Sequence, residues 1–113
     1  MTHWTTDDSI DLYLVEKWGH PYVSVNELGR VSIHPDATSE DQGPGIDLYE
    51  LVAQIRRRGV QTPLLLRFDG LLRARVRDIN QAFNTAREEY GYKAPYRGVF
   101  PIKVNQELSL IHI

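Results

Sequence analysis

PLLLRFDGLLRARVRDINQAFNTAREEYGYKAPYRGVFPIKV, residues 63–104, is the stretch that decides the fold class. Its two ends, 63–68 and 96–104, are short apolar runs typical of strands covered on both faces. Between them, apolar side chains recur every three or four residues. They predict a helix that begins at a capping Asp69, continues to about Tyr90 and is ended by Gly91. A strand, a long helix and a second strand predict a right-handed parallel crossover, and therefore an α/β fold. The helical stripe consists of Leu72, Val76, Ile79, Phe83 and Ala86.

The chain just before this crossover predicts a second helix and a linker. Residues 46–58 carry apolar side chains at i, i+3, i+4 and i+7, with Asp47 as the expected cap and Gly59 as the stop. The acidic segment 35–45 has two prolines, two glycines and no large apolar side chain. We therefore expect it to be a linker with nothing to bury.

The start of the chain predicts a hairpin preceded by a short helix. Residues 22–26 and 30–34 alternate apolar and polar side chains around a turn, which predicts two strands with one apolar and one wet face. Residues 8–18 predict a helix capped by Asp8 or Ser9 and ended by Gly19 in the left-handed conformation. The side chains expected on one face of that helix are Ile10, Leu14 and Trp18.

The composition of the 113 residues is that of an ordinary globular protein. Hydrophobic residues make up 42% and charged residues 25%, which excludes collagen-like, coiled-coil and disordered chains. No apolar run approaches the roughly 20 residues that span a bilayer, and the acidic start MTHWTTDDSI argues against a secretory leader. The absence of cysteine excludes disulfides and thiolate sites. We therefore expect no membrane association and a cytoplasmic location.

The net charge of −2 hides an asymmetry along the chain. Residues 1–50 hold ten acids and two bases, whereas the remainder holds five acids and eleven bases. The basic part could contact the phosphates of a nucleic acid, but a solvated helix face explains its arginines equally well. No aromatic residues are interleaved with the arginines to stack on bases. We therefore expect no nucleic-acid partner. The arginines concerned are Arg56, Arg57, Arg58, Arg73, Arg75 and Arg77.

Metal and phosphate motifs are not found in the sequence. The histidines lack the spacing of a zinc site, and Gly43-Pro44-Gly45 lacks the pattern of a dinucleotide loop. The four histidines are His3, His20, His34 and His112.

Lys103 is the candidate catalytic residue. It lies at the end of the second apolar run, and functional groups of parallel α/β folds collect at the C-terminal ends of strands. Apolar surroundings favour the neutral amine, which is a nucleophile able to form a Schiff base with an aldehyde. The alternative is an ordinary solvated lysine at a strand end.

Four strings of this sequence resemble one enzyme family. YRGVFPIKVNQ (96–106) is similar to the cofactor-lysine segment of the biosynthetic arginine decarboxylases, which use pyridoxal 5′-phosphate (PLP). IDLYELVAQIRRRGVQTPLLLRFDGLLRARVRDINQAF (46–83) and EEYGYKAPYRGVFPIKVNQ (88–106) resemble the early barrel of that family. WTTDDSIDLYLVEKWGHPYVSVNELGRVSIHP (4–35) resembles its N-terminal segment.

The resemblance implies a fold, a reaction and a cofactor. The fold is the (β/α)8 barrel of alanine racemase-like PLP enzymes, with a β-rich domain, and Lys103 would carry PLP as a Schiff base. The reaction converts L-arginine to agmatine and CO2 in the biosynthesis of putrescine and spermidine. The family also implies Mg²⁺, for which no ligands are identifiable in this sequence, and a homo-oligomer at full length.

The resemblance also divides the chain. We expect an N-terminal helix and hairpin with an acidic linker over 1–43 and the first elements of the barrel over 44–106. Residues 107–113 are expected to be a divergent tail, for which the explanations are a truncated reading frame or a foreign segment. The family is several times longer than this chain, so we expect an N-terminal fragment that is inactive by itself. The alternatives are a fragment of another PLP-dependent decarboxylase, for ornithine or diaminopimelate, and a small non-enzymatic binding domain.

Overall fold

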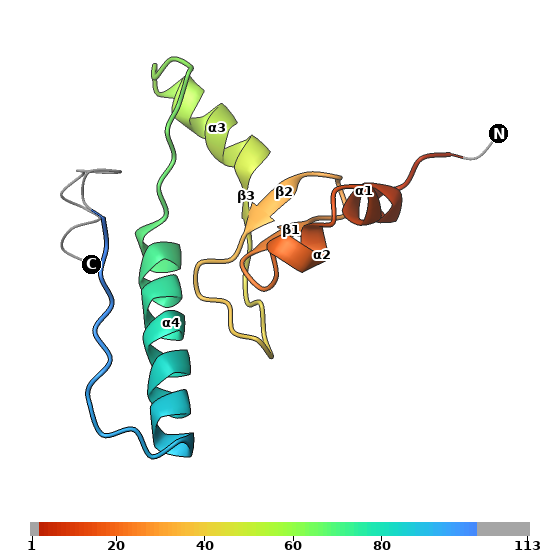
Figure 1. Cartoon of the computed structure of the whole chain (residues 1–113). Coiled ribbons are helices and arrows are strands. Elements are labelled where there is room, and N and C mark those ends of the chain that lie inside the picture. The colour runs from red at the N-terminus through yellow and green to blue at the C-terminus, as the bar shows by residue number, and fades with distance from the viewer. Residues whose placement is uncertain (1–2, 102–113) are drawn as a thin grey trace. The chain divides into compact units, whose positions relative to one another are not determined.

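The computed structural model describes residues 3–101 of the chain. The chain divides into two compact units, Met1–Arg67 and Phe68–Ile113, and we describe each by itself (Figure 1). The domain limits expected from the resemblance, at residues 43 and 106, stay a prediction.

The first unit begins with two short helices where the sequence predicted one. They are α1 (Thr6–Leu12) and α2 (Val15–Trp18). Leu14, between them, has φ 52° and lies in the left-handed region, which breaks the helix. Thr5 caps α1, and Gly19 ends α2 without a positive φ. The predicted single helix over 8–18, its cap and its left-handed end are therefore wrong.

The break changes which side chain of this segment is buried. Val15 is the buried residue of α1 and α2, whereas Leu14 and Trp18, predicted to share a face with Ile10, are exposed. α2, which carries Val15, contacts the first strand of the sheet, Val23–Val25.

The predicted hairpin is confirmed and a third strand extends it. β1 (Val23–Val25) pairs antiparallel with β2 (Val31–Ile33), and β2 pairs antiparallel with β3 (Ile46–Asp47). The hairpin turn closes through a bond from the Asn26 N–H to the Arg30 carbonyl, and Gly29 supplies the positive φ. β3 falls at the start of the segment predicted to be wholly helical.

The face of β2 predicted to be wet is buried. Ser32 and His34 are 6% and 8% exposed; on the opposite face Ile33 is also buried, whereas Val31 is 42% exposed. Segment 35–45 folds against this face, and a Cβ on Gly45 would lie only 2.7 Å from the His34 ring. Ala37, in the same segment, is 1% exposed. The segment therefore buries surface, contrary to the prediction.

The second predicted helix is confirmed as α3 (Leu48–Arg57). Asp47 caps it by accepting the Glu50 N–H. At the other end Gly59 has φ 88°, and its N–H bonds to the Arg56 carbonyl, as in a Schellman motif.

The second unit is built on the long predicted helix, α4 (Asp69–Glu89). Phe68 is the N-cap residue, so Asp69 is the first helical residue and not the predicted cap. Gly91, with φ 63°, ends the helix as predicted. The chain then runs back beside α4, where Tyr96 stacks on Phe83 with ring centroids 4.3 Å apart (Figure 1).

The predicted strands on either side of α4 are not formed in the described part of the chain. Residues 63–68 and 96–101 have no strand structure, and residues 102–104 lie outside the described range. A parallel strand needs a neighbouring strand to bond its backbone, and within 3–101 neither run has one. The coarse expectation of helices combined with a sheet is confirmed. The sheet is antiparallel, and no parallel crossover or (β/α)8 barrel is seen among residues 3–101.

Candidate functional site

Lys103, the residue predicted to be catalytic, lies outside the described residues. The run that leads to it is described as far as Pro101, and Val99 and Phe100 in that run are exposed. The two other lysines, Lys17 and Lys93, are both exposed. No described lysine therefore has the apolar surroundings that favour a neutral amine.

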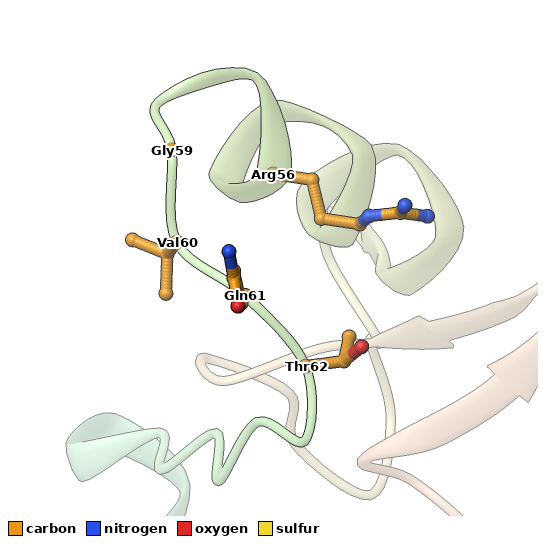
Figure 2. Close-up of a pocket in the computed structure, with 5 residues that line it drawn as sticks. All are labelled: Arg56, Gly59, Val60, Gln61 and Thr62. Atoms are coloured by element: carbon orange, nitrogen blue, oxygen red, sulfur yellow. The ribbon is translucent and has the colours of Figure 1, made fainter.

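A hollow of about 430 Å³ lies beside the C-terminal end of α3 (Figure 2). It is lined by Arg56 and by the chain from Gly59 to Thr62, which turns back at the left-handed Gly59. The Arg56 guanidinium, the Gln61 amide and the Thr62 hydroxyl give it a polar lining that can donate hydrogen bonds. Among residues 3–101, no carboxylate, imidazole or lysine lines it for acid–base chemistry. From the sequence, Arg56 was one of six arginines considered either as phosphate contacts or as part of a solvated helix face.

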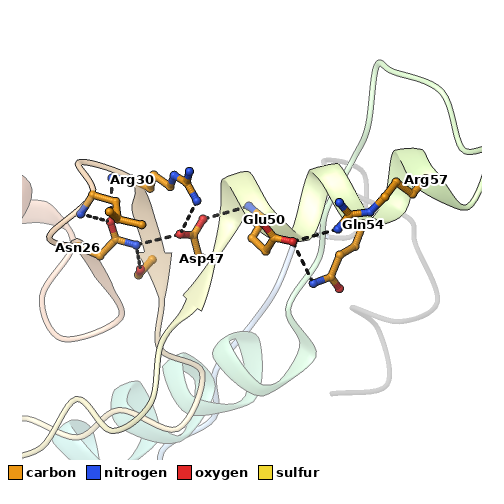
Figure 3. Close-up of polar contacts among 8 residues, drawn as sticks. Asn26, Arg30, Asp47, Glu50, Gln54 and Arg57 are labelled. Atoms are coloured by element: carbon orange, nitrogen blue, oxygen red, sulfur yellow. Dashed lines mark hydrogen bonds and ion pairs between the residues drawn. The ribbon is translucent and has the colours of Figure 1, made fainter.

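Asp47 is the centre of a polar network that joins the hairpin to α3 (Figure 3). Its Oδ2 accepts hydrogen bonds from Asn26 Nδ2 at 3.0 Å and from Arg30 Nη1 at 3.5 Å. Its Oδ1 accepts the Glu50 N–H at 3.0 Å. The Glu50 N–H is the main reason that the pKa of Asp47 lies below its usual value, and Asn26 and Arg30 lower it further. Arg30 also lies over the Tyr49 ring, 4.4 Å from its centroid.

The network continues along the exposed side of α3. Glu50 Oε1 lies 3.0 Å from Arg57 Nη2 and 3.5 Å from Gln54 Nε2 (Figure 3). Both charged side chains are exposed, so solvent weakens this pair. The sequence predicted the Asp47 cap but not the contacts across 21 residues to Asn26.

Ser24, His34 and Gly43 form a second polar group in the first unit. His34 Nδ1 lies 3.2 Å from the Gly43 carbonyl, which can only accept, and His34 Nε2 lies 2.7 Å from Ser24 Oγ. A neutral ring therefore donates from Nδ1 and accepts at Nε2. With both nitrogens engaged and its ring buried, His34 fastens segment 35–45 to the hairpin. Ser24, Ser32 and His34 occupy polar positions of the alternating pattern in the two strands, and this was the sequence signal that they share one face of the hairpin.

Residues 3–101 contain no group of three His, Cys, Asp or Glu side chains placed to hold a metal ion. Within the same range no helix has the length and apolar character needed to cross a membrane.

Sequence comparison links the chain to named proteins. A biosynthetic arginine decarboxylase from Prochlorococcus marinus (strain MIT 9515) is 46% identical over 109 residues, which is 96% of this chain and 16% of that protein. The predicted resemblance to biosynthetic arginine decarboxylases is confirmed. Further arginine decarboxylases of this kind come from Thermosynechococcus vestitus, 43% identical over 97% of this chain, and from Synechocystis sp., 45% identical over 96%. No protein-family model matches the chain.

The matched region is a small part of each arginine decarboxylase. The chain spans 15–17% of the length of these curated relatives. The similarity extends through almost all of this chain, so it includes both units of the structure.

Proposed function

We propose that this chain is the N-terminal part of a PLP-dependent biosynthetic arginine decarboxylase, which converts L-arginine to agmatine and CO2. The observation that carries the proposal is 40–46% identity to proteins of that name over 96% of the chain. The decarboxylation of arginine follows from the name of those relatives, whereas PLP and agmatine follow from the family resemblance. The Mg²⁺ and the homo-oligomer that the resemblance implies stay predictions, as does the cytoplasmic location expected from the composition.

Lys103 is the residue that we propose to hold PLP. When bound, PLP supplies an electron sink for the carbon from which CO2 leaves. Where the rest of the enzyme covers the apolar residues before Lys103, VFPI over 99–102, apolar surroundings favour the neutral amine, which can bond to the cofactor aldehyde. Lys17 and Lys93 are both exposed, so neither has apolar surroundings of this kind.

The described residues by themselves do not fit a complete PLP site. The hollow beside α3 offers one guanidinium, and residues 3–101 place no lysine or carboxylate in it. A ring-nitrogen partner, a phosphate cradle and substrate contacts must therefore come from beyond them. We infer that the 113-residue chain does not decarboxylate arginine and that its share of the site is Lys103.

The test uses a chimera in which this chain replaces the segment that it matches in the Prochlorococcus marinus relative. The chimera should form agmatine from arginine with added PLP, and the Lys103→Ala chimera should not. The 113-residue chain alone should form none. A chimera that folds, binds PLP and yet leaves arginine unchanged would contradict the proposal. Agmatine formed by the isolated chain would contradict the inferred division of the site.

Activity assays with ornithine and diaminopimelate separate the alternatives for the natural full-length protein. A preference for either over arginine would replace the proposed substrate and leave the role of Lys103 intact.

A further inference from the structure

The run of chain that leads to Lys103 is held against α4 by two contacts. The Tyr96 ring stacks on Phe83, with ring centroids 4.3 Å apart and planes only 2° from parallel. Two residues earlier, the Ala94 carbonyl accepts a hydrogen bond from Arg87 Nε. Phe83 and Arg87 are four residues apart and therefore lie on one face of α4, one turn from each other. The run follows this face of the helix (Figure 1).

Arg87 is itself held in place at the end of α4. Its Nη1 donates to Asn84 Oδ1 at 2.9 Å, and its carbonyl accepts the Tyr92 N–H at 2.9 Å. Gly91, with φ 63°, turns the chain back at this point. Because Arg87 binds the chain at two places after the turn, it fixes where the returning run begins.

Side chains of the run alternate between the α4 side and the opposite side. A Cβ on Gly98 would lie 3.3 Å from Tyr96 Oη, so positions 96 and 98 face the same way, as in an extended chain. Phe100 is 55% exposed, whereas Val99 beside it is 92% exposed. Even-numbered positions of the run therefore face α4, and odd-numbered positions face away from it.

We propose that Tyr96, stacked on Phe83, is a positioning residue that sets the face on which Lys103 leaves the run in the full-length enzyme. Lys103 lies outside the described residues and is seven positions after Tyr96, an odd number. An extended chain that continues the alternation presents these two side chains on opposite faces. A slip of one residue would turn every side chain of the run to the other face and Lys103 toward the helix.

This inference rests on the proposed function, because it concerns the residue that we propose to hold PLP. It assigns Tyr96 no contact with substrate or cofactor. Its ring acts on Lys103 through the backbone between them. The loss of the ring should therefore change how readily Lys103 reacts, and a ring without the hydroxyl should be enough to prevent that loss.

Kinetics and lysine labelling of the chimera with the Prochlorococcus marinus relative test the proposal. Tyr96→Ala should lower kcat by about tenfold or more, because a misplacement of about 1 Å can cost about a hundredfold. The PLP concentration at which borohydride reduction labels half of Lys103 should rise. Tyr96→Phe should restore both values. Tyr90→Ala is the matched control, since it removes the same side chain at the end of α4, outside the stack, and should change neither.

A double-mutant cycle assigns the effect to the stack. Phe83→Ala should lower kcat in the same direction as Tyr96→Ala. The double variant should be no slower than the slower single variant, because both substitutions remove the same contact. Effects on kcat that multiply in the double variant overturn the role of the stack.

The outcomes separate this inference from the proposed function. A folded Tyr96→Ala chimera with wild-type kcat and labelling overturns the inference, while loss of activity in Lys103→Ala still supports the proposed function. Tyr96→Phe as slow as Tyr96→Ala also overturns the role of the ring. A label on another lysine in the wild-type chimera overturns both. Far-UV circular dichroism checks folding. If Tyr96→Ala does not fold, Tyr96→Leu replaces it, since leucine keeps apolar volume without the ring, and wild-type values in that variant overturn the inference.

Discussion

Gly45→Ala is the substitution whose effect the structure defines most sharply. A Cβ at this position would lie 2.7 Å from His34 Cε1 and 3.2 Å from Ser32 Cβ, whereas carbon atoms in contact are about 3.5–4.0 Å apart. The His34 ring is not free to move aside, because Ser24 Oγ and the Gly43 carbonyl hold its two nitrogens at 2.7 Å and 3.2 Å.

Two routes of relaxation give a similar cost. Forcing an extra methyl group into packed surroundings costs about 1–3 kcal/mol. Turning the imidazole away instead breaks two hydrogen bonds, each worth about 0.5–1.5 kcal/mol. We therefore expect Gly45→Ala to lower the free energy of unfolding by about 2 kcal/mol, which corresponds to a fall in Tm of about 10 °C for a domain of this size.

Urea unfolding followed by tryptophan fluorescence measures this cost, because Trp4 and Trp18 both lie in the first unit. Gly59→Ala is the control. It has the same change in side chain and a positive φ of 88°, but no atom lies within 4 Å of the added Cβ. It should cost about 1 kcal/mol, through the backbone alone.

A double-mutant cycle with His34→Ala isolates the contact. Removing the ring should reduce the cost of Gly45→Ala by more than about 0.5 kcal/mol and leave that of Gly59→Ala unchanged. An equal cost of Gly45→Ala with and without His34 would refute the packing of segment 35–45 on the hairpin.

Three further substitutions test separate contacts. Asp47→Asn keeps a hydrogen-bond acceptor for the α3 cap but removes the carboxyl group, whose pKa is held low by the Glu50 N–H. The wild-type chain should therefore lose stability relative to this variant as pH falls from about 5 to 2, and identical urea midpoints across that range would contradict it. Thr5→Ala should lower the free energy of unfolding by about 1 kcal/mol because it removes the α1 cap, whereas Thr5→Ser should keep the cap. Equal urea midpoints for the two variants would count against the cap. Tyr96→Ala should lower the free energy of unfolding by about 0.5–1.5 kcal/mol and speed amide exchange over 92–101. Tyr96→Phe should stay near wild type, because stacking on Phe83 needs only the ring. Unchanged amide exchange in Tyr96→Ala would argue against the stack.

Local signals in the sequence predicted the elements whose causes are local. The hairpin, α3 and α4 each have periodic apolar side chains and a turn or stop residue, and all three form. Gly59 and Gly91 end their helices in the left-handed conformation, as glycine after a helix predicts. The Asp47 cap was found for the same reason, since a cap depends on residues three positions apart.

Elements that depend on distant partners were not predictable in this way. The runs at 63–68 and 96–101 have strand-like composition, but a strand forms only where a neighbouring strand pairs with it. β3 was missed because Ile46 and Asp47 pair with β2, more than ten residues earlier.

The buried polar face was missed because alternation does not say which face is covered. Segment 35–45 covers Ser32 and His34 although it has few apolar side chains. Nothing in the sequence indicated the break between α1 and α2 either, because leucine rarely adopts the left-handed conformation that Leu14 has there. Lys103 was identified from its apolar run and from the resemblance, and it lies outside the residues that the structure describes.

The most direct test of the proposed function is to map the lysine that binds PLP. The chimera carrying this chain in the Prochlorococcus marinus relative is loaded with PLP, reduced with borohydride and digested, and the labelled peptide is identified by mass spectrometry. We expect the label on Lys103. In Lys103→Ala both the label and agmatine formation should be lost, whereas Lys93→Ala should keep both. A label on another lysine, with activity intact in Lys103→Ala, would contradict it.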